Sequence, residues 1–538
     1  MMDAPTTISG DQAFAYGAIA AGISMVTSYP GSPSSETVES IIPKAREHSI
    51  YVEWSSNERV ALEMAIGASI AGRRALVCAK SVGMNVMLDT LMALNLTPVH
   101  GGLVILLGDD PGGYGSQNDQ DTRPLAAMLE MPMLEPATPS EAYDMMVNSF
   151  QLSERFNIPF IIRETRAFAQ QAGKFEMNHE VKQQVNYGLN SDSLRFVPVP
   201  KNVVSKHREL HARVEEIRNW FDSSPYNTTK GAGRKGVVAA GFAYSKLIDV
   251  IGPSLENEIS LLKLGVIYPL PHGVVLKFLQ SCDEVLVLEE NEPYIEKLLK
   301  AFAHEQKCQT KIIGKVNGTV SREGELFRWQ IQAALDRFIS DFQPYHHFLQ
   351  ENEDSEKPRQ KRFCNSCRYD EVLDLLEITA AEINQKLVFV GDPGCLVTVA
   401  DRLQAKYAIG SAIAVADGMS KTDIREKPVA LVGDSGFFHS TLPALFNAIH
   451  NRSDILIVIL DNGTTLTSGA QPHPGVPKNA LNEPAPQTDI SKIAKACGIG
   501  YVESVDLDDE QVRLQLTIKD ALEQQSLAML IIKISEKE

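Results

Sequence analysis

The sequence has 538 residues, more than one hydrophobic core accommodates, so we expect two to four domains. Its composition is that of a globular protein, with 44% hydrophobic and 22% charged residues, and its formal net charge at pH 7 is −17. Because the sequence has no stripe rich in lysine and arginine, this charge argues against nucleic acid or an anionic membrane as a partner.

The termini and the apolar runs indicate an intracellular protein. The N-terminal segment MMDAPTTISGD has neither a basic n-region nor an apolar h-region, so we expect no signal peptide. The longest apolar runs, GLVILLG (102–108) and DILIVIL (454–460), have the length of a buried strand and are too short to span a bilayer. Seven cysteines in a chain without a secretion signal are typical of free thiols or metal ligands. We therefore expect a soluble, cytoplasmic protein.

The first third of the chain alternates apolar runs with helical patterns. The apolar runs are GISMVTSYP (22–30), IYVEW (50–54), RALVCAK (74–80) and GLVILLGDD (102–110). Helical patterns separate them at SSETVESIIPKARE (34–47), NERVALEMAIGASIAG (57–72) and GMNVMLDTLMALN (83–95). In the second of these, one helical face is shared by Val60, Met64, Gly67, Ala68 and Ala71. This rhythm predicts βαβ units and an α/β fold with a mainly parallel, doubly wound sheet.

The rest of the chain divides into further segments. The rhythm is interrupted between about 174 and 234, where Lys, Asn, Ser and Pro are frequent, and it resumes with KGVVAAG, ISLLKLGVIYPLP, GVVLKFLQSC and DEVLVLEEN. The charged run HHFLQENEDSEKPRQKR (346–362) predicts a linker, and a third α/β segment follows it. We expect a first domain at 1–175, a connector at 176–234, a smaller second domain at 235–340, a linker at 341–362 and a third domain at 363–538.

Two polar stretches in the third segment each follow an apolar run directly. Asp434 in GDSGFFHS follows KPVALVG, and Asn462 in DNGTT follows DILIVIL. The sequence between them has helical spacing at Phe438, Leu442, Leu445, Phe446 and Ile449, which indicates strand, helix, strand.

In a parallel sheet, Asp434 and Asn462 then both fall at the carboxyl edge, where open α/β sheets bind ligands. A carboxylate, an amide oxygen and a nearby backbone carbonyl suit Mg²⁺, which shares its ligand shell with phosphates. The helix N-terminus at Gly436 offers N–H groups to a phosphate. The pattern therefore favours a metal-bridged diphosphate over the alternative that the two residues only cap turns.

Residues 433–475, GDSGFFHSTLPALFNAIHNRSDILIVILDNGTTLTSGAQPHPG, resemble the thiamine-diphosphate motif of the 2-oxoacid:ferredoxin oxidoreductases. Within that family the sequence is most similar to the alpha (large) subunits of indolepyruvate ferredoxin oxidoreductases. The resemblance extends to TSYPGSPSSE (27–36), YVEWSSNERVALE (51–63), DDPGGYGSQNDQD (109–121) and LLKLGVIYPLP (261–271), and so covers nearly the whole chain. It implies a pyrimidine-binding domain first, a transketolase C-terminal-like domain in the middle and a diphosphate-binding domain last.

The resemblance also implies roles for single residues. Asp434 and Asn462 would bind Mg²⁺ through their side chains, with Thr464 offering its carbonyl. The residues around the diphosphate would be Ser435, His439, Ser468 and Gly469.

The resemblance assigns two residues to the catalytic end of the cofactor. Glu58 would bind the pyrimidine N1′ and stabilise the imino tautomer. Glu63, one turn later, is the competitor, and a plain helix N-terminal charge is the alternative role of Glu58. The Ser32 hydroxyl would lie close to the substrate or to the reactive thiazolium carbon.

Three cysteines match the positions of the cluster nearest thiamine in related oxidoreductases. Cys364 and Cys367 have C-x₂-C spacing in FCNSC, and Cys395 lies in GDPGC, so together they could hold a [4Fe–4S] cluster or zinc. The fourth cluster ligand of the relatives has no counterpart, because this chain has LIIKISEKE in that region; Cys497 is more typical of a small buried side chain. The ferredoxin-like tail of the indolepyruvate enzymes, with its two runs of cysteines, is also absent from the sequence.

We therefore expect thiamine-diphosphate-dependent and Mg²⁺-dependent oxidative decarboxylation of a 2-oxoacid, such as the arylpyruvate indolepyruvate, to an acyl-CoA. Coenzyme A would be the co-substrate, and ferredoxin or another carrier would accept the electrons. A smaller second subunit would complete the enzyme, and two copies of this chain would pair. The alternative is a non-redox thiamine-dependent decarboxylase or carboligase without iron–sulfur clusters. A non-catalytic subunit is disfavoured by the presence of Glu58, Asp434 and Asn462.

Overall fold

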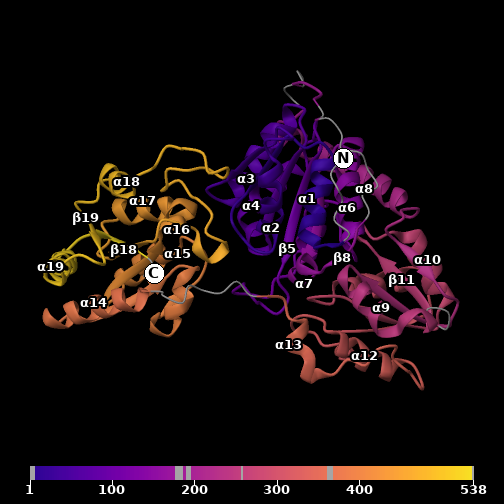
Figure 1. Cartoon of the computed structure of the whole chain (residues 1–538). Coiled ribbons are helices and arrows are strands. Elements are labelled where there is room, and N and C mark those ends of the chain that lie inside the picture. Colours follow the sequence, from indigo (N-terminus) through magenta and orange to yellow (C-terminus); the bar gives the residue numbers. More distant parts are fainter. Residues whose placement is uncertain are drawn as a thin grey trace. The chain divides into compact units, whose positions relative to one another are not determined.

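The computed structural model describes residues 7–175, 184, 186–189, 195–255, 259–359 and 368–535. The chain forms two compact units (Figure 1). Unit 1 comprises Met1–Val52 and Glu58–Gln360, and unit 2 comprises Glu53–Asn57 and Lys361–Glu538.

A seven-stranded sheet of order β12-β6-β7-β5-β4-β2-β3 forms the first part of unit 1. Its strands are β2 (Met25–Ser28), β3 (Tyr51–Trp54), β4 (Ala75–Lys80), β5 (Leu103–Asp109), β6 (Met133–Leu134), β7 (Phe160–Thr165) and β12 (Val266–Tyr268). The pairs from β2 through β4, β5 and β7 to β6 are parallel, whereas β12 is antiparallel to its neighbour β6. β5 is buried at every position, as expected for a parallel strand that is covered on both faces.

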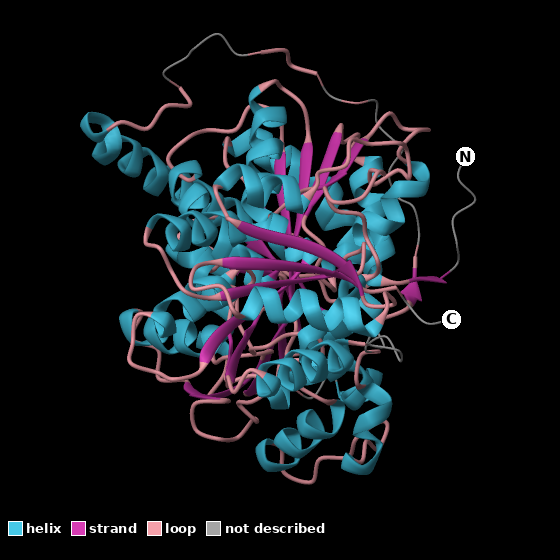
Figure 2. Ribbon diagram, turned by 90° about the vertical axis from the view of Figure 1, so that its left-hand side faces the viewer, coloured by secondary structure: helices cyan, strands magenta, loops and turns pink. Residues whose placement is uncertain are grey.

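Helices cover both faces of the strands (Figure 2). In this part of unit 1 they are α1 (Gly10–Ala20), α2 (Ser34–Ile41), α3 (Glu58–Ile70), α4 (Ser81–Leu94), α5 (Arg123–Met128), α6 (Pro139–Phe156) and α7 (Arg166–Gln170). A short antiparallel ribbon joins β1 (Thr7–Ile8) to β8 (Gly173–Lys174). The predicted α/β fold class with doubly wound parallel sheets is confirmed.

α3 buries the face opposite to the one that its apolar residues mark in the sequence. The buried residues are Glu58, Ala61, Leu62, Ala65 and Ser69. Met64, in contrast, is 38% exposed. The buried face is mostly small or polar because α3 packs closely against α4, and close packing of two helices favours short side chains.

A five-stranded sheet of order β14-β13-β10-β11-β9 forms the second part of unit 1. Its strands are β9 (Thr228–Lys230), β10 (Lys235–Ala240), β11 (Ser260–Leu264), β13 (Glu284–Leu288) and β14 (Lys311–Ile313), and β9 is the antiparallel one. The helices of this part are α9 (Phe242–Leu255), α10 (His272–Ser281), α11 (Tyr294–Glu305) and α12 (Arg328–Phe338). α8 (Val203–Phe221) forms within the range that we expected to be a connector, and α13 (Glu353–Glu356) within the expected linker. The domain boundaries themselves stay a prediction.

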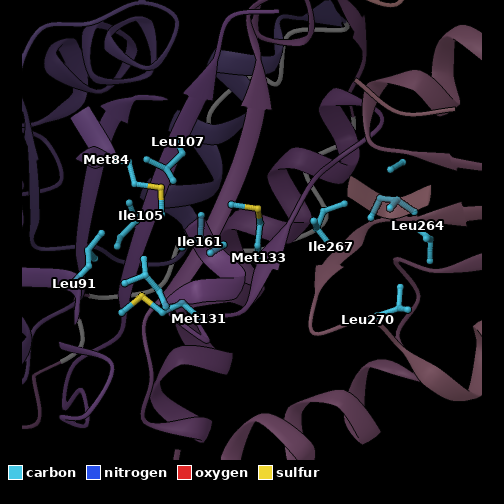
Figure 3. Close-up of a cluster of buried hydrophobic side chains, with 14 of the residues drawn as sticks. Met84, Leu91, Ile105, Leu107, Met131, Met133, Ile161, Leu264, Ile267 and Leu270 are labelled. Atoms are coloured by element: carbon cyan, nitrogen blue, oxygen red, sulfur yellow. The ribbon is translucent and has the colours of Figure 1, made fainter. Parts of the chain in front are cut away.

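The two sheets of unit 1 share a core. The segment LLKLGVIYPLP supplies β11 to the five-stranded sheet and, two residues later, β12 to the seven-stranded sheet. Figure 3 shows Ile105 and Ile161 of the seven-stranded sheet in the same cluster of buried side chains as Leu264 and Ile267. The cluster is continuous across both sheets, so the sequence from β2 to β14 folds around common apolar contacts.

Unit 2 is built on a parallel six-stranded sheet of order β16-β15-β17-β18-β20-β19. Its strands are β15 (Leu387–Gly391), β16 (Ala405–Lys406), β17 (Lys427–Gly433), β18 (Leu456–Asp461), β19 (Tyr501–Asp506) and β20 (Ala528–Lys533). Its helices are α14 (Tyr369–Glu382), α15 (Ser411–Ser420), α16 (Asp434–Gly436), α17 (Leu442–His450), α18 (Ile490–Cys497) and α19 (Gln511–Leu522). Separate apolar clusters cover the two faces of this sheet.

The predicted helix between β17 and β18 is interrupted by a π-helical turn, Phe437–Thr441, which joins α16 to α17. A π turn contains more residues than an α turn, so it changes which side chains face the sheet. Leu445 of the expected face is buried, whereas Phe446 is 53% exposed. Phe437, which precedes the expected face, is fully buried.

Candidate functional site

Three neighbouring strands of unit 2 each lead into an aspartate at the carboxyl edge of the sheet. Asp392 follows β15, Asp434 follows β17 and Asp461 is the last residue of β18. The backbone N–H of Gly463 donates to Asp434 Oδ2 over 2.7 Å, so the turn after β18 is in contact with the residue that follows β17. The structure thus brings Asp434 next to the turn that contains Asn462, at the edge where the sequence predicted a ligand.

The carboxyl group of Asp434 is buried and held by several donors. Its Oδ1 accepts the N–H of Ser435 at 2.8 Å, and its Oδ2 lies 3.1 Å from His473 Nε2. The Nδ1 of His473 accepts the N–H of Gly475, so the ring proton resides on Nε2 and is donated to Asp434. These bonds fix the orientation of the carboxyl group. His473 was missed in the sequence, because a histidine 39 positions from its partner gives no local pattern.

Asp461 and Asp434 form a pair of close carboxyl groups. Partial burial and the neighbouring Asp434 raise the pKa of Asp461 to about 6. Next to them, Asn462 Oδ1 accepts the N–H of Thr464 at 3.2 Å. This set of oxygen atoms, with two carboxyl groups that repel each other when both are ionised, fits a hard divalent cation such as Mg²⁺.

Asp392 is a third acidic group at this edge. It is fully buried and accepts the N–H groups of Gly410 and Ala412 at the start of α15, at 2.8 and 2.9 Å. Burial raises the pKa of Asp392 to about 6, although both N–H groups and His439 favour its ionised form. Asp392 was not predicted as a site residue. It could have been, since VGDPG at Asp392 repeats the VGDSG pattern at Asp434.

The other residues expected around the diphosphate lie in two segments of unit 2. His439 lies in the π-helical turn, is buried, and has its Nδ1 2.7 Å from Ser440 Oγ. Ser468 ends a short 3₁₀ turn, its carbonyl accepts from Gln471 Nε2, and Gly469 follows with a φ of 129°. Their roles toward a diphosphate stay a prediction.

Glu58 in unit 1 is the first residue of α3 and is 5% exposed. Its side chain lies against Gly83 of α4, where a Cβ atom would be 2.6 Å from Glu58 Cγ. Glu63 is instead half exposed, where it pairs with Arg59 and accepts from Thr90 Oγ1. Of the two candidate carboxylates, Glu58 is the one in a sheltered position.

Ser32 lies in the turn between β2 and α2. Its Oγ donates to Glu36 Oε1 at 2.8 Å. Glu164, on β7, is fully buried, and burial together with Asp11 and Glu36 raises the pKa of this carboxyl group well above its usual value. The hydroxyl group of Ser34 donates to the carbonyl of Ala79. Glu164 thus lies close to Ser34 of the predicted active-site turn, and its burial favours the protonated form of the carboxyl group.

The cysteine predictions are not tested by the structure. Cys364 and Cys367 lie outside the described residues. Cys395 is the first residue of a 3₁₀ segment (Cys395–Arg402) and is partly buried. Cys497 ends α18 and packs, partly buried, against the core of unit 2.

Comparison with known proteins identifies the family. Residues 16–197 match the family model "Pyruvate flavodoxin/ferredoxin oxidoreductase, thiamine diP-bdg", and residues 397–532 match "Thiamine pyrophosphate enzyme, C-terminal TPP binding domain". The chain is 34% identical to "Indolepyruvate oxidoreductase subunit IorA" of Methanothermobacter thermautotrophicus, over 97% of this chain and 85% of the relative. It is 32% identical to the protein of the same name from Pyrococcus abyssi, over 97% of this chain and 84% of the relative. The chain belongs to the family of indolepyruvate oxidoreductase IorA subunits.

The IorA family confirms the identification made from the sequence, and the chain is an oxidoreductase subunit of alpha type. A solved 2-oxoglutarate:ferredoxin oxidoreductase from Magnetococcus marinus aligns with 15% identity and a TM-score of 0.43, over 57% of this chain and 61% of that chain. This likeness adds nothing to the family assignment. Among the described residues, no helix is both long enough and apolar enough to cross a membrane.

Proposed function

We propose that this chain binds thiamine diphosphate and Mg²⁺ and, as one subunit of a cytoplasmic complex, oxidatively decarboxylates a 2-oxoacid. The observation that carries the proposal is the acidic edge of unit 2, where Asp434, Asp461 and Asn462 lie together. This edge falls within the range that matches a thiamine pyrophosphate family model. The two close carboxyl groups and the amide oxygen support a site for a divalent cation with phosphate oxygens in its shell.

The proposed metal ligands are the side chains of Asp434 and Asn462 and the carbonyl of Thr464. The bonds from Ser435, Gly463 and His473 to Asp434 keep one carboxyl orientation, which reduces the ordering cost of metal binding. His439, Ser468 and Gly469 are proposed to line the diphosphate.

Glu58 is the proposed partner of the aminopyrimidine ring. A buried carboxylate can hold a proton on the ring nitrogen and so favour the imino tautomer. Thiamine diphosphate, when bound, supplies the nucleophilic carbon for the 2-oxo group and the electron sink for decarboxylation. The hydroxyl group of Ser32 is proposed to bind the substrate, because it lies in a sheltered turn and its acceptor Glu36 fixes its direction.

The overall reaction must dispose of two electrons. A 2-oxoacid anion and coenzyme A give an acyl-CoA, CO₂, a proton and two electrons, and the electrons pass to ferredoxin or a similar carrier. We favour an arylpyruvate such as indolepyruvate as substrate, because the matched relatives carry that name. Because these relatives are named as one subunit of an oxidoreductase, we also propose a second subunit as partner. Pairing of two copies of this chain belongs to the same proposal.

A non-redox decarboxylase or carboligase is the second candidate function. The observation that favours it is that the sequence supplies Cys364, Cys367 and Cys395 but no counterpart of the fourth cluster ligand. An anaerobic iron and sulfide determination separates the two candidates. About four irons per chain in the cluster would support electron transfer through this chain.

Calorimetric titration with thiamine diphosphate and Mg²⁺ tests the site. Asp434→Ala should weaken binding by more than about tenfold, because a metal ligand is lost along with its hydrogen-bonded surroundings. Asp423→Ala, which changes an exposed aspartate of the same unit, is the matched control and should bind as wild type does. Equal affinity of Asp434→Ala and wild type would contradict the proposed site.

A further inference from the structure

A group of three metal-ligating side chains lies in unit 1 and includes none of the residues considered above. His207 and His211 are one turn apart on α8, and their rings lie 4.5 Å apart between centroids. Both Nε2 atoms face the carboxyl group of Glu130, which lies in the turn between α5 and β6. The two histidine side chains are about half exposed, so an ion from solution can reach them.

The distances within this cluster match a tetrahedral ion. Glu130 Oε1 lies 3.1 Å from His211 Nε2 and 3.6 Å from His207 Nε2. One ligand atom from each of the three residues lies within 4.8 Å of the other two. Bonds of about 2.0–2.1 Å at tetrahedral angles would separate neighbouring ligand atoms by about 3.3 Å. The two separations from Glu130 Oε1 are close to this value, and the third is within 4.8 Å, so small side-chain movements would complete a zinc site.

The backbone and the second carboxyl oxygen of Glu130 are both unusual. Glu130 has a φ of 53°, the left-handed conformation that favours glycine. It occupies the turn that ends α5, where the N–H of Met131 donates to the carbonyl of Ala126. A glutamate in this conformation costs stability unless its side chain contributes something in return. Its Oε2 is also buried without a hydrogen-bond partner among the described residues.

We propose that Glu130, His207 and His211 bind a Zn²⁺ ion, with water in the fourth position. Two neutral imidazoles and one carboxylate favour zinc over Mg²⁺, which prefers an all-oxygen shell. Without an ion, the Nε2 atoms of both histidines share Glu130 Oε1 as their partner. With the ion bound, each of the three atoms would contact the ion instead. Because the ligands come from two elements far apart in the sequence, the ion links α8 to the turn before β6 and so stabilises unit 1.

Equilibrium dialysis of the full chain against Zn²⁺ tests the proposal. Wild type should bind one equivalent more than the variant His207→Ala/His211→Ala, and each single variant should lose affinity by about tenfold or more. Zinc held by cysteines is common to all these proteins and cancels in the comparison. His304→Ala, at an exposed position in α11, is the control and should bind as wild type does. Equal stoichiometry and affinity in wild type and the double variant would overturn the proposal.

Glu130→Gly separates the metal site from an ordinary ion pair. Glycine adopts the left-handed backbone without strain, so the metal-free variant should melt at the same temperature as metal-free wild type or higher. Zinc should raise the melting temperature of wild type by more than that of Glu130→Gly, because any zinc held by cysteines acts equally on both. A zinc-induced rise of equal size in both proteins would show that Glu130 is not a ligand.

Discussion

Glu58 serves both the fold and the proposed chemistry at a single position. A carboxylate at a helix N-terminus is favoured by the helix dipole, so the sequence alone could not separate this role from a catalytic one. The structure adds that Glu58 is buried against Gly83, where any side chain would collide with it. This contact could not be predicted, because it depends on how α3 and α4 pack and not on a local pattern.

Replacement of Glu58 by glutamine should separate binding from turnover. The amide keeps the shape of the side chain but cannot stabilise the charged ring nitrogen, so 2-oxoacid turnover should fall by about 10²–10⁴-fold. Thiamine diphosphate affinity should change little, because the metal and diphosphate contacts remain. Glu63→Gln is the matched control and should keep most of the activity. The reverse pattern, with Glu63→Gln inactive and Glu58→Gln active, would identify Glu63 as the carboxylate.

The buried carboxyl group of Glu164 predicts a pH-dependent stability. Its pKa in the folded protein is raised well above the unfolded value of about 4.3, mainly by burial. The contribution of such a group to stability is fully present below the unfolded pKa. It decreases as the pH rises from the unfolded pKa to the folded pKa, because only the folded protein keeps the proton in that range. Glu164→Gln has no proton to lose at this position. The difference in free energy of unfolding, variant minus wild type, should therefore increase by up to about 1.4 kcal/mol per pH unit in that range.

Urea unfolding at several pH values between 5 and 9 measures the effect. Glu523→Gln, at an exposed position, is the control and should give a curve parallel to that of wild type. Parallel curves for Glu164→Gln and wild type would show that Glu164 titrates alike in the folded and unfolded protein.

At the scale of elements, the sequence predicts buried strands better than it predicts helix faces or sheet membership. β5 and β18 are recognisable because a parallel strand covered on both faces is a continuous apolar run. The buried face of α3 is hard to recognise, because Leu62 is its only large apolar residue and the others are small or polar. β12 has only three residues, so nothing local shows that it joins a different sheet from β11.

In the candidate site, too, some residues could be predicted from a local sequence pattern and others could not. Asp434 and Asn462 could be predicted, because a polar residue after a buried strand marks the carboxyl edge of a sheet. Asp392 has the same signal, whereas His473 reaches Asp434 only through the fold of a long loop.

Arg123 joins the elements of the two sheets in unit 1 and should be costly to replace. Its guanidinium group is buried and pairs with Asp121 and with Glu289, which follows β13, each at 2.7 Å. Arg123→Leu leaves both carboxyl groups buried without their cation and should lower the free energy of unfolding by about 3–5 kcal/mol.

The exposed pair of Arg322 and Glu292 offers the matched control, since Arg322→Leu should cost only about 0–1 kcal/mol. Chemical denaturation followed by circular dichroism gives both values. A similar small loss in the two variants would mean that the buried network does not contribute to linking the sheets.

For the whole molecule, the remaining question is how electrons leave the proposed site. Oxidation of the decarboxylated substrate releases two electrons, and an acceptor must lie within reach. The sequence contains no glycine-rich loop that we assign to a flavin or nicotinamide, and it supplies at most three of four cluster ligands. The family to which the chain belongs is named for a subunit, which favours a partner that completes the reaction.

The purified chain, mixed with a 2-oxoacid, coenzyme A and a viologen dye, should therefore reduce the dye only at the background rate. Addition of the second subunit should start dye reduction, because the partner supplies the missing electron path. The same mixture with Asp434→Ala should stay at background, which excludes activity of the partner alone. Full oxidative turnover by the chain without a partner would refute the prediction. Release of an aldehyde in place of acyl-CoA would favour the non-redox decarboxylase, since a proton and not an oxidant then completes the reaction.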